Sequence, residues 1–442
     1  MNLLGWMLAP EESLAQWDEH AALAAAIHAD GLTRTLVCGM GGSSLVADVL
    51  AETFGATDLH VLDSTNPAAV RAAGHGAELD RTLFVISSKS GNTVETLAFC
   101  HYFAARARPE QFIAITEVGS PLDVLARARK FRAVVPHPSG VGGRYSALTA
   151  IGMLPAALGR VDGRALLTRT RGVDVPAAKT LGAAIAAKAK AGCDKLCLTP
   201  PAPLAALAYW IEQLIAESSG KDGRGVVPIV QDPSRGSLPD MQAVSPPDFS
   251  SDPLDLGAEF LRWEYATAAL CEGLGVNAFD QPDVEETKLL ARQELERVRG
   301  RDGARQVAAV ATMSPAALRR SAKAGDYCAI LAYVPPTPDM FARLQHLRAA
   351  WGRTLQCATT LGIGPRYLHS TGQLHKGGPD SGLFLVITTD TPEDLAIPEM
   401  GTTFGDLHRA QARGDVRALL ARGRRVAHVH LSNPMELSQL EP

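Results

Sequence analysis

A turn rich in hydroxyl side chains could bind a phosphate group. It follows a short apolar segment, 82–87, and residues 88–93 read Ser-Lys-Ser-Gly-Asn-Thr. Hydroxyls, a lysine and a glycine within one strand-to-helix turn suit the oxygens of a phosphate monoester, with the helix end supplying positive charge. The candidate phosphate ligands in this turn are Ser88, Lys89, Ser90 and Thr93. Taken alone, the turn is also compatible with an ordinary helix cap.

A second turn, Gly39 to Ser44, is rich in glycine and precedes a predicted helix. Its glycines let the backbone approach an anion closely, and the helix that follows offers free N–H groups. The turn does not fit a dinucleotide fingerprint, because Ser44 stands where Gly or Ala is required and Ser64 stands where a ribose-binding acid is expected. We therefore expect Gly42 and Ser43 to belong to a phosphate site.

Two charged side chains could carry proton-transfer chemistry. Arg144 lies in a glycine-rich turn, residues 140–146, that could aim it at a developing oxyanion. Glu217 lies near the end of a predicted helix, 204–218, where the helix dipole disfavours a carboxylate and so favours proton uptake, as a general base requires. Taken alone, Arg144 could also be a surface ion-pair partner and Glu217 a solvated side chain.

The elements that must position these side chains follow from an alternation of strand-like and helical segments. Short β-branched runs alternate with alanine-rich stretches, which predicts a parallel sheet covered by helices on both faces. Such sheets bind ligands at the carboxyl ends of neighbouring strands, and both candidate phosphate turns fall there. The predicted strands of this sheet are 33–38, 58–62, 82–87, 112–115 and 133–135.

The whole chain is predicted to be a doubly wound α/β protein of three units, 1–170, 171–300 and 301–442. The first unit holds the phosphate turns and the second holds Glu217. The segment 233–253 is rich in Pro, Ser and Asp and is expected to form a long loop, which is often functional in a compact domain. Strands of the second and third units are predicted at 194–198, 226–230, 327–333, 383–388 and 426–431.

Composition and charge favour a small molecule as the partner. The 43 basic and 47 acidic residues are interspersed and leave a net charge of −4, so no nucleic-acid or anionic membrane contact is predicted. The N-terminus lacks a basic signal region and no apolar run reaches the roughly 18 residues of a membrane span, which favours a cytoplasmic protein. The seven cysteines lack CxxC spacing, so we expect buried reduced thiols and no metal site.

The serine turn carries a family resemblance. Residues 88–96 read Ser-x-Ser-Gly-x-Thr-x-Glu-Thr after a predicted strand, and this pattern resembles the signature of the sugar isomerase (SIS) fold. The resemblance implies flavodoxin-like SIS domains for the first two units, followed by a C-terminal α/β unit. In that family the hydroxyl residues bind a sugar phosphate, and the positions that match are Ser43, Ser88, Ser90 and Thr93.

Three further segments resemble phosphoglucose isomerases, in that family's order. Gly-Gly-Arg-Tyr-Ser places Arg144 where the family's arginine faces an enediolate, and Glu-Ser-x-Gly-Lys places Glu217 at its proton-shuttling glutamate. The segment 277–288 resembles the family's Asn-x-Phe-Asp-Gln-x-x-Val-Glu-x-x-Lys pattern. That likeness implies substrate contact by Gln281 and a part in ring opening for Lys288.

The ring-opening histidine of phosphoglucose isomerases is missing from its usual place, because residues 138–345 contain no histidine. The segment 366–379 holds His369 and His375 and resembles the corresponding segment in the isomerase half of fused transaldolase-phosphoglucose isomerases. Either histidine could open the ring, and a structural role stays open for both. The chain has no transaldolase half, so the resemblance implies the isomerase activity alone.

Taken together, the resemblance implies an aldose-ketose isomerase that interconverts glucose 6-phosphate and fructose 6-phosphate through a cis-enediolate. Such chemistry requires neither a metal nor an organic cofactor, and the family suggests a cytoplasmic homodimer. Two alternatives stay open at this point. The isomerase could also act on mannose 6-phosphate, which shares the enediol, or the chain could be a SIS-type regulator that binds phosphosugars without catalysis.

Overall fold

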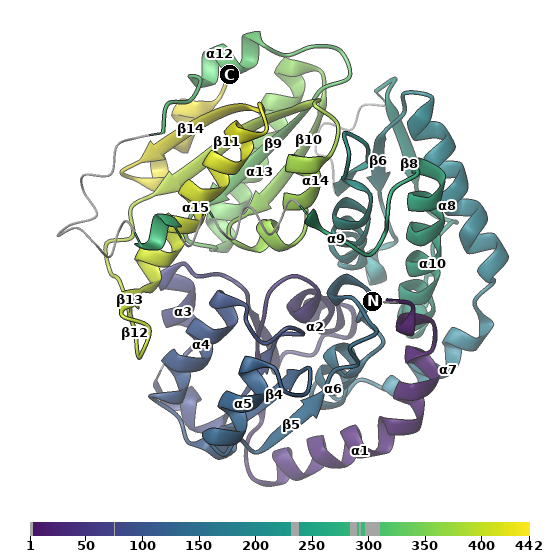
Figure 1. Ribbon diagram of the computed structural model, residues 1–442, viewed down its shortest axis with the longest axis vertical. Coiled ribbons are helices and arrows are strands. Elements are labelled where there is room, and N and C mark those ends of the chain that lie inside the picture. The colour runs from purple at the N-terminus through teal and green to yellow at the C-terminus, as the bar shows by residue number, and fades with distance from the viewer. Residues whose placement is uncertain (1–2, 75, 231–237, 283–289, 291–292, 297–309) are drawn as a thin grey trace.

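The computed structural model describes residues 3–74, 76–230, 238–282, 290, 293–296 and 310–442 (Figure 1). Three parallel sheets, each flanked by helices, form most of this structure. In Figure 1 the first sheet occupies the lower half, the second lies at the right and the third at the upper left. Parallel strands alternating with helices confirm the predicted α/β class.

The first sheet has five parallel strands in the order β2-β1-β3-β4-β5. Because β2 and β3 lie on opposite sides of β1, the connections that leave β1 and β3 diverge and open a crevice at their carboxyl ends. All five strands were predicted, with ends that differ by one residue at most. They are β1 (Arg34–Cys38), β2 (Leu59–Leu62), β3 (Thr82–Ser87), β4 (Phe112–Thr116) and β5 (Ala133–Pro136).

Alternate residues of each central strand enter two separate cores. In β3, Leu83 and Val85 join the core on one face, whereas Phe84 and Ile86 join the core on the other. This period of two explains why a strand buried on both faces reads as an unbroken apolar run. The helices around this sheet are α1 (Ala9–Ala29), α2 (Gly42–Phe54), α3 (Pro67–Ala73), α4 (Val94–Ala104), α5 (Pro121–Ala128) and α6 (Ala150–Leu158).

The second sheet has three parallel strands in the order β7-β6-β8. Strands β6 (Lys195–Leu198) and β7 (Val227–Val230) were predicted, but β8 (Met241–Val244) falls in the segment 233–253 that the sequence predicted to be a loop. That prediction was wrong at β8, because four residues with a single β-branched side chain give little strand signal before they pair with β6. The helices of this region are α7 (Gly163–Arg169), α8 (Val175–Lys190), α9 (Leu207–Ser219) and α10 (Leu256–Leu274).

The third sheet has four parallel strands in the order β10-β9-β11-β14. Its predicted strands are confirmed. The strands are β9 (Tyr327–Tyr333), β10 (Ala358–Ile363), β11 (Gly382–Thr389) and β14 (Arg425–Leu431), with β12 (Ala396–Ile397) and β13 (Thr402–Thr403) as a small antiparallel pair. The helices are α12 (Pro315–Arg320), α13 (Pro338–Leu355), α14 (Gly372–Gly377) and α15 (Phe404–Ala421).

The third sheet and its helices pack against both other regions. Strand β10 lies beside β7, so the second and third sheets meet at their edges. Helix α15 packs on α4 of the first region, where the rings of Phe404 and Phe99 stack with centroids 5.9 Å apart. Figure 1 shows α15, in yellow, next to α3 and α4. The crevice of the first sheet is therefore covered by elements from later in the chain.

All seven cysteines are free thiols. Five are buried as predicted, whereas Cys193 and Cys197 are only partly buried. In the part of the chain that the structure describes, each helix is too short or too polar to cross a membrane.

Candidate active site

A cavity of about 520 Å³ lies at the carboxyl ends of β1 and β3. It is bounded by the first sheet, by α9 of the second region and by the turn η8 (Arg366–His369) of the third. Most of the sequence-predicted site residues meet at this one cavity. They are Gly42, Ser43, Lys89, Ser90, Thr93, Arg144, Glu217, Gln281 and His369.

The glycine turn lets three segments approach each other. Gly41 has a left-handed φ of 55°, and a Cβ atom there would come within 2.5 Å of the carbonyl oxygen of His369. A Cβ atom on Gly42 would overlap the carbonyl group of Gly143, next to Arg144. Any larger residue would force apart the Arg144 turn, the His369 turn and the start of α2. These glycines therefore serve close packing around the cavity, beyond the anion contact expected from the sequence.

The serine turn forms the end of the cavity where the sequence predicts a phosphate site, and its own hydrogen bonds hold its shape. The Ser88 hydroxyl accepts from the Gly91 amide at 3.1 Å and lies 2.9 Å from the Thr93 hydroxyl. Ser88 is buried beneath the turn, whereas the exposed Ser90 donates to Asn92 at 2.7 Å. Thr93 and Ser90 line the cavity, so Ser88 supports the turn and the outer hydroxyls are placed to meet a ligand.

Lys89 is the cation at this end of the cavity. Its ammonium group lies 3.7 Å from the Glu117 carboxylate, and both side chains line the cavity. Partial burial lowers the pKa of Lys89, the Glu117 carboxylate opposes this shift, and the positive charge of Arg144 adds to it. An anionic ligand beside Lys89 would relieve part of its desolvation.

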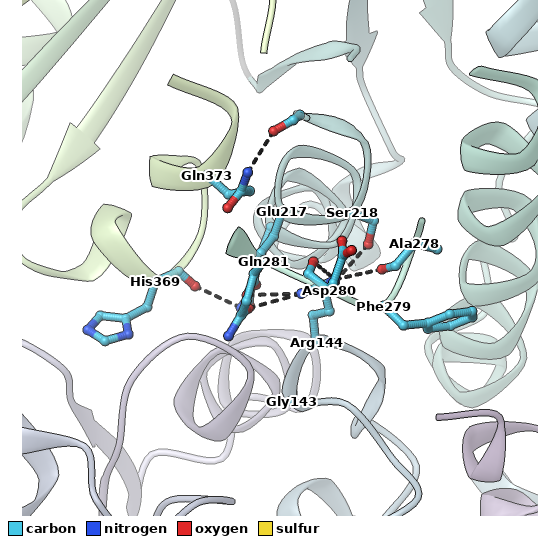
Figure 2. A network of polar contacts seen from close by, with 12 residues as sticks. Gly143, Arg144, Glu217, Ser218, Ala278, Phe279, Asp280, Gln281, His369 and Gln373 are labelled. Carbon is cyan, nitrogen blue, oxygen red and sulfur yellow. Dashed lines mark hydrogen bonds and ion pairs between the residues drawn. The ribbon is translucent and has the colours of Figure 1, made fainter. Parts of the chain in front are cut away.

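Arg144 stands at the centre of the opposite end, in the short turn η4 (Gly143–Tyr145). Its side chain is buried and every nitrogen has a partner (Figure 2). Nε donates to the Ser218 hydroxyl at 2.8 Å, and Nη1 donates to Gln281 Oε1 at 3.1 Å. Nη2 donates to the carbonyl oxygens of Ala278 at 2.6 Å and Asp280 at 2.9 Å. A guanidinium fixed in this way is a preorganised positive charge.

Glu217 forms an ion pair with Arg144, with Oε1 3.1 Å from Nη1. It lies in the last turn of α9, as predicted, and is 8% exposed. Its other oxygen, Oε2, accepts from Gln213 Nε2 at 3.0 Å, one helical turn earlier. The same Gln213 nitrogen donates to the carbonyl oxygen of His369 at 2.8 Å, so one amide ties the carboxylate to the His369 turn. A buried, ionised and oriented carboxylate is suited to accept a proton from a ligand.

His369 reaches the cavity and pairs with Glu95, which was not among the predicted site residues. His369 Nε2 lies 2.9 Å from Glu95 Oε1, and the Glu95 side chain is buried at the start of α4. An ionised carboxylate accepts, so Nε2 carries the hydrogen and Nδ1 is left for exchange with a ligand. Histidine–carboxylate pairs of this kind fix both the tautomer and the orientation of the ring.

The His369 turn is clamped to the first region by Arg366. Its guanidinium lies 2.6 Å from Asp48 of α2 and 3.0 Å from Asp63, which follows β2. Burial alone would lower the pKa of Arg366, but the two carboxylates outweigh this effect and raise it. The clamp joins the turn that carries His369 to the helix that begins at the glycine turn.

His375 lies elsewhere, in the core of the third region. It is 2% exposed, its Nδ1 lies 3.0 Å from the Tyr327 hydroxyl, and its ring packs near Phe384. Burial, with the neighbouring charges of Lys376 and Arg424, lowers the pKa of His375 well below its usual range. A ring that stays neutral in the core is not placed to give a proton to a cavity ligand, so the structure brings only one of the two candidate histidines to the site.

Lys288, the remaining predicted residue, lies outside the described residues. Further polar side chains at the cavity were not predicted, among them Glu95, Glu117, Gln213 and Gln411. Glu95 was part of the serine-turn pattern, and Gln213 precedes Glu217 by one helical turn, so both had a sequence signal that was overlooked. Gln411 had none, because it lies in α15 far from every motif.

The comparisons with known proteins agree with these motifs. No protein-family model matches the chain. Over 210 residues it is 34% identical to the probable glucose-6-phosphate isomerase of Natronomonas pharaonis, covering 44% of this chain and 48% of that protein. Over 212 residues it is 35% identical to the glucose-6-phosphate isomerase of Synechococcus sp., covering 43% and 40% respectively. The chain spans about half the length of the curated relatives it matches.

Among solved structures, the glucose-6-phosphate isomerase of Chlamydia trachomatis is similar with a TM-score of 0.52 at 19% identity. The match covers 67% of this chain and 75% of that one. At this identity the likeness shows the fold, and it confirms the doubly wound fold class expected from the sequence.

Proposed function

We propose that this protein is a glucose-6-phosphate isomerase, which interconverts glucose 6-phosphate and fructose 6-phosphate. The observation that carries the proposal is the buried Glu217–Arg144 pair facing the serine turn across one cavity. A carboxylate and a fixed guanidinium are the groups that a proton shuttle through an enediolate needs. The names of the relatives support the same reaction.

Binding begins at the phosphate end. Ser43, Ser90, Thr93 and the Lys89 ammonium group hold the substrate phosphate, aided by the N-terminus of α4. The phosphate is remote from the reacting carbons, so its binding energy fixes C1 and C2 beside Glu217.

Ring opening follows at His369. In its imidazolium form, which carries hydrogens on both nitrogens, His369 gives the Nδ1 proton to the ring oxygen as the bond from that oxygen to C1 breaks, while the proton of the C1 hydroxyl is removed by a base. Glu95 stabilises the charged imidazolium before the transfer and holds the ring in place. The resemblance assigns the base to Lys288, which lies outside the described residues and stays a prediction.

Isomerisation then proceeds on the open chain. Glu217 removes the proton from C2, the enediolate forms beside Arg144, and the hydroxyl proton passes from O2 to O1. Glu217 returns its proton to C1, which gives the ketose. Arg144 stabilises the negative charge on the enediolate oxygens, and Gln281, which already contacts the guanidinium, faces the same ligand.

A cytoplasmic homodimer belongs to the same proposal and rests on the family resemblance. Light scattering of the purified protein tests the assembly, and a monomer would count against the dimer.

The deciding experiment is a coupled assay of fructose 6-phosphate conversion, comparing the wild type with Glu217→Gln. We expect the variant to lose about 10²-fold or more in kcat while substrate binding persists. Glu264→Gln is the matched control, because Glu264 is a buried glutamate of α10 outside the cavity and should keep its activity. Mannose 6-phosphate assayed alongside decides whether the isomerase has the broader substrate range.

A wild type that binds phosphosugars tightly but does not convert them would overturn the proposal. That result would move the assignment to a phosphosugar-binding regulator. Retention of Glu217, Arg144 and His369 at one cavity argues for the enzyme, because a regulator needs the phosphate end only.

A further inference from the structure

A buried chain of polar side chains lies behind the His369–Glu95 pair. Gln411 Nε2 donates to Glu95 Oε1 at 2.6 Å, the same oxygen that faces His369. The Thr65 hydroxyl lies 2.7 Å from Gln411 Oε1 and 3.1 Å from His408 Nδ1. Gln411, Thr65 and His408 are each at most 2% exposed. A polar network buried so deeply is costly unless its members are paired, so its geometry is tightly constrained.

In this network of side chains, each hydrogen bond can have its donor and acceptor assigned in one way only. Glu95 accepts as a carboxylate, so the amide nitrogen of Gln411 faces it and the amide oxygen faces Thr65. Thr65 then gives its single hydrogen to Gln411, and His408 Nδ1 must donate to Thr65. Burial lowers the pKa of His408 to about 3, so its ring is neutral and this tautomer is set by the contact.

This network of buried side chains also joins two regions of the fold. Thr65 and Glu95 belong to the first region, after β2 and at the start of α4, whereas His408 and Gln411 lie on α15. Helix α15 packs on α4 through Phe404 and Phe99. The amide oxygen of Gln411 is thus fixed by Thr65, and its amide nitrogen donates to the Glu95 carboxylate that orients His369.

We propose that Gln411 is a positioning residue for ring opening, and that α15 acts on the reaction through it. Gln411 fixes the rotation of the Glu95 carboxylate, which in turn fixes the Nε2–H tautomer and the aim of the His369 ring. Thr65 and His408 fix the orientation of the Gln411 amide. This inference rests on the proposed function and deepens it.

The test compares Gln411→Met with the wild type in the full chain. Methionine has a similar shape but no hydrogen to donate and only a weakly accepting sulfur, so Glu95 loses a partner and His369 loses its fixed orientation. We expect kcat/KM for fructose 6-phosphate to fall about 10- to 100-fold, mostly through kcat, as for other partners of oriented histidines. Thr65→Val should show a smaller loss of the same kind, and Thr65→Ser, which keeps the hydroxyl, should restore activity to within about twofold.

Gln111→Met is the matched control for destabilisation. Gln111 is 2% exposed and donates to the carbonyl oxygens of Leu79 and Thr82. The Gln111→Met variant therefore loses a similar set of buried hydrogen bonds, but far from the cavity. We expect its thermal unfolding midpoint to drop without a loss of kcat/KM beyond about twofold. A purely structural role for Gln411 predicts the same pattern for both variants, and that result would overturn the inference.

A second readout does not depend on activity. Nitrogen NMR of ¹⁵N-histidine protein reports the tautomer of His369, with His369→Asn used to identify its signals. At a pH where the ring is neutral, we expect the Nε2–H tautomer in the wild type and a mixed population in Gln411→Met; unchanged signals would overturn the inference. If the wild type does not convert fructose 6-phosphate, the proposed function fails, and the NMR comparison still decides whether Gln411 orients the His369 ring.

Discussion

The two ends of the cavity are assembled in different ways. The proposed phosphate end is largely one turn, 88–93, whose hydrogen bonds join residues two to five positions apart. The other end holds Arg144, Glu217 and His369 and is called the reaction end here. There the side chain of Arg144 bonds to Ser218, 74 positions away, and to Gln281, 137 positions away. A local turn keeps its shape by itself, whereas the reaction end exists only when all three regions are packed together. The two ends should therefore respond differently to mutation.

The largest effect is expected at Arg144, where the most segments converge. Arg144→Lys keeps a positive charge but cannot reach Ser218, Gln281 and the two backbone carbonyls at once. We expect kcat to fall by about 10²- to 10³-fold, because a fixed donor to the enediolate is lost. Steady-state kinetics with fructose 6-phosphate measure this loss. A fall in binding alone, with kcat retained, would place Arg144 at the phosphate end instead.

Two histidines six residues apart sharpen the comparison. His369→Asn should lower kcat by about 10²-fold or more, because the proposed ring-opening acid is lost. His375→Asn should leave kcat within about twofold but lower the free energy of unfolding by about 1–3 kcal/mol, because a buried Tyr327 hydroxyl loses its partner. Kinetics and urea unfolding of both variants check this. Equal kinetic losses would show that position relative to the cavity does not decide the role.

Substitutions at the phosphate end should change binding and leave the chemistry intact. Thr93→Val removes a hydroxyl that lines the cavity and bonds to Ser88. We expect KM to rise about 10-fold, the usual scale for one hydrogen bond to a charged group, with kcat within about threefold. Ser90→Ala should act in the same direction. A large loss of kcat with unchanged KM would contradict the division between the two ends.

The smallest effect on activity is expected at Glu212, which shares α9 with Glu217. Burial raises the pKa of Glu212 to about 7, although Arg348 and Arg366 oppose the shift. The folded protein therefore binds the Glu212 proton more tightly than the unfolded chain does. The protonated Glu212 contributes its full share to the free energy of unfolding below about pH 4.5, and this contribution is lost as pH rises through 7. Between pH 5 and pH 8, Glu212→Gln should gain about 1–3 kcal/mol in unfolding free energy relative to the wild type.

Urea unfolding at the two pH values measures this shift, and kcat/KM at pH 7.5 should stay within about twofold. Parallel stability curves for the two proteins would contradict the raised pKa. A large loss of activity would show that the reaction end extends further along α9 than its contacts indicate.

Much of the frame could be predicted from the sequence. The strands of the first sheet were read from β-branched runs, since residues buried on both faces leave an unbroken apolar signal. Glu217 was correctly placed at the end of its helix. Strand β8 was not predicted, because its pairing with β6, and not its own composition, makes it a strand. Glu95 lies inside the serine-turn pattern and Gln213 lies one helical turn before Glu217, but neither position shows its role locally, because their partner His369 is far away in the sequence.

The sequence by itself determined the class of the fold and the turn that is proposed to bind a phosphate. Both depend on contacts between near neighbours, which a local pattern records. Only the tertiary structure decided that His369, and not His375, faces the cavity, and that Gln411 of α15 reaches Glu95. These outcomes depend on how α15 and the turn after β10 pack on the first sheet, and packing between distant segments leaves no periodic trace in either segment alone.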